Sequence, residues 1–306
     1  MKVLILGANG LVGRSLNNRL SKNKNILNLI TSTRMDTDLF SLEQTVKLLK
    51  DTKPDILINA AAKVGGIYAN NTKRTEFILE NLKINTNLLE ASIPYNNMKI
   101  FNLGSSCIYP LDAKNPIKET SIMSGKLEPT NSPYAMAKLT AIEIGDAISS
   151  QYGHQIINLM PTNLYGPNDN FSENESHVIP GLIYRMHKAK INNEKKFEIW
   201  GSGKPLREFL YVDDLSDAIN FLIEEGVDSK LLNIGSGQEI SISELARKIQ
   251  EVVGFEGDVL FNSKMPDGIN RKLLDSSIIK NLGWEPKTGL EEGLRKTYNW
   301  FFKNKC

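Results

Sequence analysis

The sequence predicts an α/β fold built on a doubly wound parallel sheet, and three observations support this. Short apolar runs alternate with longer amphipathic stretches through the first half of the 306 residues, as is typical of a parallel sheet covered by helices on both faces. A glycine-rich turn, GANGLVG, directly follows the first apolar run. The hydrophobic content of 41% and charged content of 24% are ordinary for a globular protein, and the length allows a large core.

Each expected strand is a short apolar run bounded by turn signals, and each expected helix is an amphipathic stretch between two such runs. The strands are KVLIL, ILNLI, DILIN, KIFNL and IINLM. The helices cover residues 11–21, 41–50, 72–92 and 134–152.

The glycines of the first turn are spaced for binding a dinucleotide. Gly7, Gly10 and Gly13 follow the first strand and open the first helix, in the spacing G-x-x-G-x-x-G. Such a turn brings the backbone close to a pyrophosphate, which the free N–H groups of the helix N-terminus then bind. A structural glycine turn is the alternative for an isolated match, but the strand before it and the helix after it favour a cofactor site.

The second half of the chain is less regular, with loop signals such as WGSGKP, NIGSGQ and MPDGINRK between shorter helices. We therefore expect a Rossmann-type dinucleotide-binding domain with a smaller, interleaved C-terminal domain for the substrate. The first comprises residues 1–163 and about 206–236, and the second comprises residues 164–205 and 237–306.

The end of the second strand favours NADPH over NADH. It reads TSTRMDTDL, without an acidic residue in position to bind a ribose 2′-hydroxyl. Arg34 stands there instead, where a guanidinium can pair with a 2′-phosphate. A solvated surface charge is the alternative interpretation of Arg34.

Composition excludes several classes of function. A net charge of +2 does not indicate a nucleic-acid or membrane surface, and no apolar run approaches the roughly 18 residues of a membrane span. The start MKVLIL reads as a first strand and not as a signal peptide. Cys107 and Cys306 provide no disulfide framework, so we expect a reducing cytoplasm, and with three histidines they show no metal-ligand spacing.

The segment YAMAK places Tyr134 and Lys138 four residues apart, on one face of the expected helix. A nearby ammonium stabilises a phenolate, which would lower the pKa of Tyr134 and suit it to proton transfer at a carbonyl. Ser105, at the end of the fourth strand, has a hydroxyl for the same carbonyl oxygen. An isolated Y-x-x-x-K is more often a surface pair, but here it follows a dinucleotide-binding turn. The combination resembles the extended short-chain dehydrogenase/reductase superfamily.

Longer motifs resemble one family within that superfamily, the GDP-L-fucose synthases. They are AAKVGGI, GSSCIYP, LEPTN, MPTNLYGPNDNF, SHVIP, WGSGKPLREFLYVDDL and PDG with RKLLD, and they span nearly the whole chain. The resemblance implies a GDP-4-keto-6-deoxy-mannose 3,5-epimerase/4-reductase, in which one site inverts C3 and C5 and then reduces the C4 ketone with NADPH. It also implies a homodimer that pairs the helices expected at residues 72–92 and 134–152.

The resemblance assigns roles to five residues. Ser105, Tyr134 and Lys138 match the reductase triad, and Cys107 and His177 match the pair that moves protons at C3 and C5, with Cys107 as base and His177 as acid. A thiolate and an imidazole both exchange protons near neutral pH. On an extended strand end, Cys107 would project to the same side as Ser105, and Ser106 to the other.

The resemblance also implies ligand contacts. One departure from the family is Asn9, where relatives often carry a second basic residue, so NADPH preference would depend more on Arg34. Substrate contacts are expected at Arg185, Trp200, Arg207 and Asp267. The purely structural alternatives are a surface salt bridge for each arginine, a core position for the tryptophan and a turn for the aspartate. NADP(H) contacts are expected at Gly7, Asn9, Gly10, Leu11, Val12, Gly13, Arg34, Asp38, Leu39, Ala60, Ala61, Leu103, Gly104, Ser105, Ser106, Tyr134, Lys138, Pro161, Asn163, Leu164 and His177.

Three other functions remain open at this point. The chain could reduce C4 only, acting on a GDP-4-keto-heptose made by a separate epimerase. It could be a sugar-nucleotide 4-epimerase that retains NAD, although Arg34 argues against this. It could be a regulatory dinucleotide-binding protein without catalysis, although such proteins typically lose the tyrosine or lysine that Tyr134 and Lys138 retain.

Overall fold

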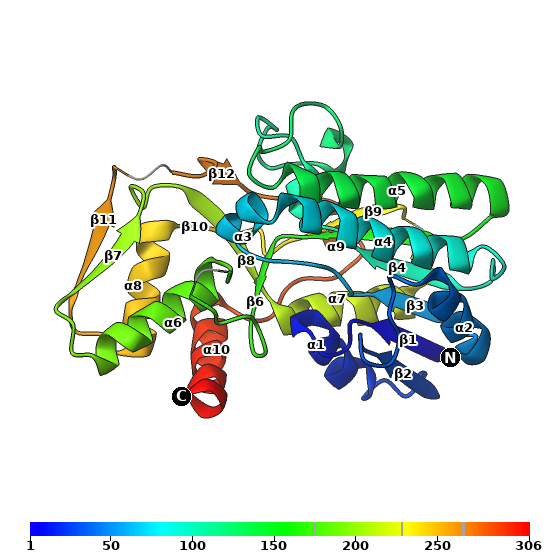
Figure 1. The fold of residues 1–306 in the computed structure, drawn as a ribbon, viewed down its shortest axis with the longest axis horizontal. Coiled ribbons are helices and arrows are strands. Elements are labelled where there is room, and N and C mark those ends of the chain that lie inside the picture. The colour runs from blue at the N-terminus through cyan, green and yellow to red at the C-terminus, as the bar shows by residue number, and fades with distance from the viewer. Residues whose placement is uncertain (174, 228, 265–266) are drawn as a thin grey trace.

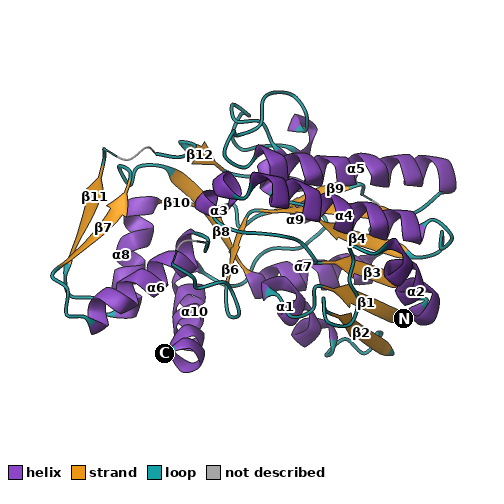
Figure 2. Cartoon of the chain, viewed as in Figure 1, coloured by secondary structure: helices purple, strands orange, loops and turns teal. Residues whose placement is uncertain are grey.

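A six-stranded parallel sheet forms the centre of the fold in the computed structural model, which describes residues 1–173, 175–227, 229–264 and 267–306. The strand order is β2-β1-β3-β4-β5-β9, which confirms the doubly wound α/β prediction. Figure 2 shows β2, β1, β3 and β4 side by side in this order. The strands are β1 (Lys2–Leu6), β2 (Asn28–Ser32), β3 (Ile56–Asn59), β4 (Lys99–Leu103), β5 (Ile156–Pro161) and β9 (Leu231–Ile234).

Both faces of this sheet are apolar, because side chains alternate along each strand and helices cover each side. On β1, Val3 and Ile5 belong to one core cluster, and Leu4 and Leu6 belong to another. Figure 1 shows the helices on the two sides of the sheet. The first cluster lies under α1 (Leu11–Leu20) and α7 (Val212–Glu225), and the second under α2 (Leu42–Thr52), α4 (Arg74–Ser92) and α5 (Ser132–Tyr152).

The helix expected at residues 72–92 is present as α4, and a further short helix, α3 (Ile67–Thr72), precedes it. Lys73 separates them with φ −113° and ψ 42°, outside the helical range. The helix expected at 134–152 begins earlier, at Ser132, because Pro133 is favourable in the first turn of a helix. It ends at Gly153, whose φ of 78° suits glycine. Helices α4 and α5 pack side by side.

The remaining elements build a second core, in which Ile183, Leu245, Ile249 and Phe301 are buried together. The domain boundaries stay a prediction. Within the described ranges, no helix is long and apolar enough to cross a membrane. The further helices are α6 (Val178–Ile191), α8 (Ile242–Val253), α9 (Ser277–Asn281) and α10 (Leu290–Lys305), with 3-10 turns η1 (Ser106–Ile108) and η2 (Glu119–Ser121). The further strands are β6 (Asn163–Tyr165), β7 (Lys196–Trp200), β8 (Leu206–Tyr211), β10 (Glu239–Ser241), β11 (Asp258–Asn262) and β12 (Arg271–Lys272).

Candidate active site

The glycine turn lies at the carboxyl end of β1, between β2 and β3 in the sheet. Gly7 has φ 71°, and a Cβ there would lie 2.8 Å from backbone atoms of Ala60 and Ala61. A Cβ on Gly13 would lie 2.2 Å from the carbonyl oxygen of Gly7. Gly10 begins α1 without any side-chain cap, so the N–H groups of Leu11, Val12 and Gly13 open a helix end suited to a phosphate.

The loop after β2 carries the predicted selectivity residue on the surface. Arg34 is exposed, and its guanidinium carbon lies 4.7 Å from the centre of the Phe40 ring, which orients it by a cation–π contact. Asp38 accepts the Phe40 N–H at 3.0 Å, whereas the Leu39 side chain is buried in the core. Asn9 is exposed, and its carbonyl accepts from Arg14 at 3.0 Å.

The predicted reductase triad meets at the carboxyl end of β4. Lys138 is buried, and its Nζ donates to the carbonyl of Leu103 at 2.6 Å. Ser105 hydrogen-bonds to the Tyr134 phenol. The Lys138 Nζ lies 5.9 Å from the centre of the Tyr134 ring. The sequence therefore identified side chains that the fold brings together, and their catalytic roles stay predictions.

Burial dominates the ionisation of this triad. It raises the pKa of Tyr134 well above its usual value, the nearby Cys107 raises it further, and the hydrogen bond from Ser105 opposes the rise. Burial also lowers the pKa of Lys138 to about 8. The expected lowering of the Tyr134 pKa by Lys138 is thus wrong for this structure, because desolvation of the phenolate is the dominant influence.

Cys107 is close to the triad, but it does not continue an extended strand as expected. Ser105 is the last extended residue, with φ −162° and ψ 147°, and residues 106–108 form the 3-10 turn η1. The turn forms because Ser105 Oγ accepts the Cys107 N–H at 3.2 Å. Cys107 is half-buried against Phe77 and Tyr134, and Ser106 is buried. The alternation argument was therefore wrong, although Cys107 still lies beside Tyr134.

A residue of the loop between β3 and α3 holds the His177 ring in place. His177 precedes α6, and its ring hydrogen-bonds to the carbonyl of Gly65. His177 as a whole is exposed, but the protein around its ring lowers the pKa of the imidazole by desolvation, and the Gly65 bond offsets part of this. A Cβ on Gly65 would lie 3.2 Å from Phe77 Cζ, and Phe77 packs edge-on to Tyr134 with 6.3 Å between ring centres. His177 therefore belongs to the neighbourhood of the triad.

The sequence did not identify the residues that hold His177 in place. Gly66 N–H donates to the carbonyl of Glu175 at 2.9 Å, and a Cβ on Gly66 would lie 2.2 Å from the carbonyl of Ser176. Asn70 Nδ2 donates to Gly65 at 2.7 Å. The double glycine of AAKVGGI was the available signal, since two adjacent glycines indicate a close backbone approach.

The other expected cofactor residues lie along the same edge of the sheet. Gly104 N–H donates to Leu159 at 2.8 Å, which extends the pairing of β4 and β5 by one residue. Pro161 ends β5, and Asn163 Nδ2 donates to the carbonyl of Glu208 at 2.9 Å. Leu164 is half-buried against the core.

The four expected substrate residues lie on the second part of the chain. Arg185 stacks over Phe197 at 5.3 Å, and Trp200 is 64% exposed at the end of β7. Burial lowers the pKa of Arg207 and Asp267 opposes this, so the two are neighbours. Asp267 accepts from Ser202 N at 2.8 Å and from Ser202 Oγ at 2.6 Å. Pro266 of the PDG motif lies outside the described residues.

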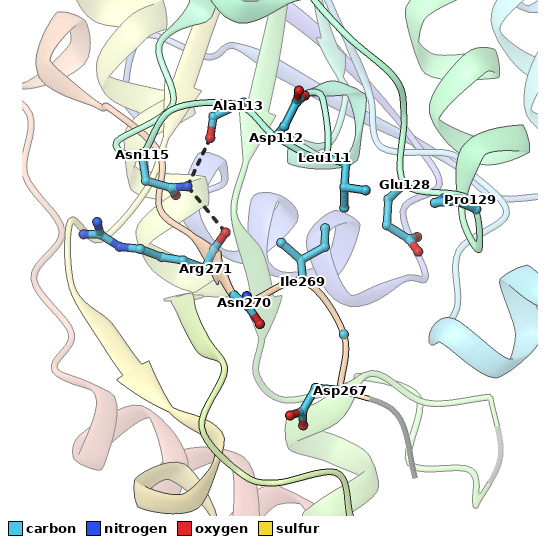
Figure 3. A pocket seen from close by; sticks show the side chains of 11 residues that line it. Leu111, Asp112, Ala113, Asn115, Glu128, Pro129, Asp267, Ile269, Asn270 and Arg271 are labelled. Carbon is cyan, nitrogen blue, oxygen red and sulfur yellow. Dashed lines mark hydrogen bonds between the residues drawn. The ribbon is translucent and has the colours of Figure 1, made fainter.

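A cavity of about 520 Å³ opens between the 111–129 segment and the 267–271 segment (Figure 3). Of the expected substrate residues only Asp267 lines it, and Glu128 on its opposite wall precedes α5. Asn115 Nδ2 donates to the carbonyls of Ala113 at 3.2 Å and of Arg271 at 3.5 Å, which ties the two segments together. The cavity lining combines apolar side chains such as Leu111 and Ile269 with charged ones such as Glu128 and Asp267, a mixture that is typical of ligand pockets.

Known proteins resemble this chain over its whole length. The model of the NAD dependent epimerase/dehydratase family matches residues 3–235. GDP-L-fucose synthase 1 of Arabidopsis thaliana is 46% identical over 305 residues, which are 100% of this chain and 94% of that protein. The structure of a GDP-6-OMe-4-keto-L-xylo-heptose reductase from C. jejuni has a TM-score of 0.92 at 32% identity, covering 99% of this chain and 98% of its own. A GDP-mannoheptose C4 reductase from Campylobacter jejuni with NADP bound has a TM-score of 0.88 at 33% identity, with 98% of each chain covered.

Proposed function

Because the chain belongs to the NAD dependent epimerase/dehydratase family, we propose that it acts on a GDP-4-keto-6-deoxy-sugar. It epimerises C3 and C5 and reduces the C4 ketone with NADPH, giving GDP-L-fucose or a close analogue. One observation carries the proposal: Ser105, Cys107, Tyr134 and Lys138 gather at the carboxyl end of β4, and His177 is tied to the Gly65 carbonyl beside them.

The residues present fit NADP(H). Gly7 and Gly13 permit the close backbone turn, and the uncapped N-terminus of α1 offers N–H groups to the pyrophosphate. Arg34 is exposed and oriented by Phe40, as a partner for the 2′-phosphate requires. The similarity to a reductase structure with NADP bound supports the same choice. Bound NADPH would supply a hydride to the C4 carbon.

Reduction needs a proton donor at the C4 oxygen. Tyr134 is a neutral phenol near pH 7, since burial raises a pKa that already lies above neutrality, and it therefore holds a proton for the oxygen as negative charge develops there. Ser105 binds the phenol and would donate to the same oxygen. Lys138, buried and fixed by Leu103, supplies a positive charge on the helix that carries Tyr134.

Epimerisation needs proton removal and delivery at carbons next to that ketone. Removal at C3 or C5 places negative charge on the C4 oxygen, which Ser105 and Tyr134 stabilise. Cys107 is the proposed base and His177 the proposed acid. The lowered pKa of His177 makes its protonated form a stronger acid, and its bond to Gly65 leaves the other ring nitrogen for the substrate.

The nucleotide part of the substrate is assigned to the second part of the chain. Arg185 and Arg207 are partly desolvated guanidiniums suited to a diphosphate. The exposed ring of Trp200 would pack on a base or ribose. Asp267 would accept hydrogen bonds from hydroxyl groups of the substrate, although the Ser202 hydroxyl already donates to one of its carboxylate oxygens.

The proposal is tested by incubating the protein with GDP-4-keto-6-deoxy-mannose in deuterated water and following C3 and C5 by NMR. Without NADPH we expect deuterium at both carbons, and with NADPH we expect the reduced product. Cys107→Ser should lose deuterium uptake but still reduce an already epimerised ketone. The matched control is Cys306→Ser, which removes the other, remote cysteine. Absence of deuterium uptake in the wild type would rule out the epimerase role.

A second candidate is a C4 reductase that acts on a GDP-4-keto-heptose made by a separate epimerase. The similarity to two heptose reductase structures favours it, and in this case Cys107 and His177 would only position the substrate. The heptose homologue of the substrate, tested in the same assay, distinguishes the two functions.

We also propose a homodimer, built on the side-by-side helices α4 and α5. Leu79 on α4 and Met136 on α5 are 48% and 46% exposed, which suits a face that a second copy covers. Sedimentation analysis tests this, and a monomer at micromolar concentration would contradict it.

A further inference from the structure

The N-terminus of α5 contacts the thiol of Cys107 through Asn131. The Asn131 Nδ2 donates to Cys107 Sγ at 3.4 Å. Three residues further along the same helix, Tyr134 hydrogen-bonds to Ser105. Two pairs of side chains therefore join the end of β4 to the start of α5, one through the predicted reductase group and one through the proposed base.

The Asn131 side chain contacts the thiol instead of making the helix-capping hydrogen bond that its position favours. Asn131 is the N-cap residue of α5, where an asparagine oxygen usually accepts a backbone N–H and stabilises the helix. Its side chain makes no cap hydrogen bond. Its Oδ1 is buried and has no hydrogen-bond partner in the described structure, an arrangement that destabilises the folded state. The side chain is thus turned toward the thiol at the expense of helix stability.

The neighbouring residues hold Asn131 in this position. The Glu128 carboxylate accepts the backbone N–H of Asn131 at 3.1 Å and of Thr130 at 3.2 Å. From α4, Arg74 donates to the carbonyl of Pro129 at 2.8 Å and to Ser132 Oγ at 3.3 Å. These contacts fix the backbone on both sides of Asn131, so its amide is preorganised.

We propose that Asn131 is a positioning residue for Cys107, which holds Sγ and stabilises its thiolate form. The inference rests on the proposed function only for the use made of the thiolate. An amide N–H binds a charged sulfur more strongly than a neutral one, so the contact favours loss of the thiol proton. The N-terminus of α5, with its partial positive charge, acts in the same direction.

Other ionisable groups lie near this thiol or contact the residues around it, and they are left unchanged by the test. They are Tyr134 and Lys138 on α5, Glu128 before it, Arg74 on α4 and His177 before α6.

The chain has only two cysteines, so Cys306→Ser leaves Cys107 as the single thiol. In that background, the rate of alkylation by iodoacetamide is measured against pH for Asn131, Asn131→Ala and Asn131→Asp. The pH midpoint is compared, and not the absolute rate, because truncation also changes access to sulfur. The loss of one hydrogen bond to a charged group should raise the midpoint by about 1 pH unit in Asn131→Ala. Asn131→Asp adds a like charge and should raise it further.

The control for lost helix stability is Ser41→Ala, which removes a real N-cap from α2. It should lower the melting temperature and leave the midpoint unchanged. Asn131→Asp keeps a good N-cap residue, so at least one variant should fold normally. Unchanged midpoints in both Asn131 variants would overturn the proposal.

Deuterium uptake at C3 and C5, measured on the same variants, separates the two levels of inference. If the alkylation midpoint and the pH profile of deuterium uptake shift by the same amount, the result supports both the role of Asn131 and the role of Cys107 as the base. A shift of the midpoint alone supports the role of Asn131 and argues against Cys107 as the base.

Discussion

Replacing Gly66 with alanine tests whether one backbone contact sets the position of His177. Gly66 is the N-cap of α3, with φ −66° and ψ 179°, which alanine adopts without strain. The nearest obstacle among the described residues is the carbonyl oxygen of Ser176, 2.2 Å from the position of the new Cβ. Because Gly66 N–H also donates to Glu175 at 2.9 Å, the two segments cannot separate without losing a hydrogen bond.

The expected size of the effect follows from this overlap. Non-bonded carbon contacts are most favourable at about 3.5 Å, so the backbone at Ser176 must move by roughly 1 Å. His177 is the next residue, and a displacement of about 1 Å in a catalytic group costs roughly 100-fold in rate. Overpacking of this kind costs about 1–3 kcal/mol in stability, so the protein should remain folded.

The assay measures deuterium uptake at C3 and C5 of GDP-4-keto-6-deoxy-mannose by NMR, without NADPH. The melting temperature of each variant is measured in parallel. The control is Gly289→Ala. Gly289 is also an N-cap, of α10, with φ −65° and ψ 153°, and apart from its chain neighbours no heavy atom of the described residues lies within 4 Å of its Cβ position. An uptake rate for Gly66→Ala within about threefold of the Gly289→Ala rate would refute the reasoning.

Three further predictions follow from single contacts. Arg34→Ala should weaken NADPH binding by about 10- to 100-fold and leave NADH binding unchanged; fluorescence titration checks this, and equal losses for both cofactors would contradict it. Burial lowers the pKa of Lys138 from 10.5 to about 8, so between these values the unfolded chain binds more protons and stability rises with pH. From about pH 7 to about pH 11, the free energy of unfolding of the cofactor-free wild type should therefore gain about 3 kcal/mol relative to Lys138→Met; parallel stability curves from urea titrations would exclude this. Lys73→Met removes an ion pair with Glu175 whose side chains are 42% and 46% exposed, so deuterium uptake should stay within about twofold of wild type, and a tenfold loss would show that the pair matters.

The fold was predictable because its signals are local. Each strand of the main sheet's first half is an apolar run, and the glycine turn marks the carboxyl end of β1. The break at Lys73 was not predictable, because it depends on contacts of α3 with residues about 100 positions later, such as the bond between Gly66 and Glu175. Periodicity within the segment does not contain that information.

The site divides in the same way. The spacing of Tyr134 and Lys138 fixes their common helix face, so their approach to the end of β4 could be expected. The 3-10 turn at Cys107 could not, because a single hydrogen bond from its N–H to Ser105 Oγ overrides the alternation of an extended chain. The direction of the Asn131 side chain was equally hidden, since sequence preference alone predicts a helix cap.

The arrangement of elements explains how reduction and epimerisation can share a site and still be separable. In both reactions, as proposed, negative charge develops on the C4 oxygen, so Ser105 and Tyr134 serve each of them. The groups proposed to act on carbon come from other elements: Cys107 from the turn η1, and His177 from the segment before α6. Substitution of the Cys107 or the His177 side chain would therefore remove proton transfer at C3 and C5 and leave the bond of Lys138 to Leu103 and that of Ser105 to Tyr134 in place. The question whether the chain is an epimerase/reductase or a reductase alone thus depends on how well Gly66 and Asn131 position those two groups, which the Gly66→Ala and Asn131→Ala measurements address directly.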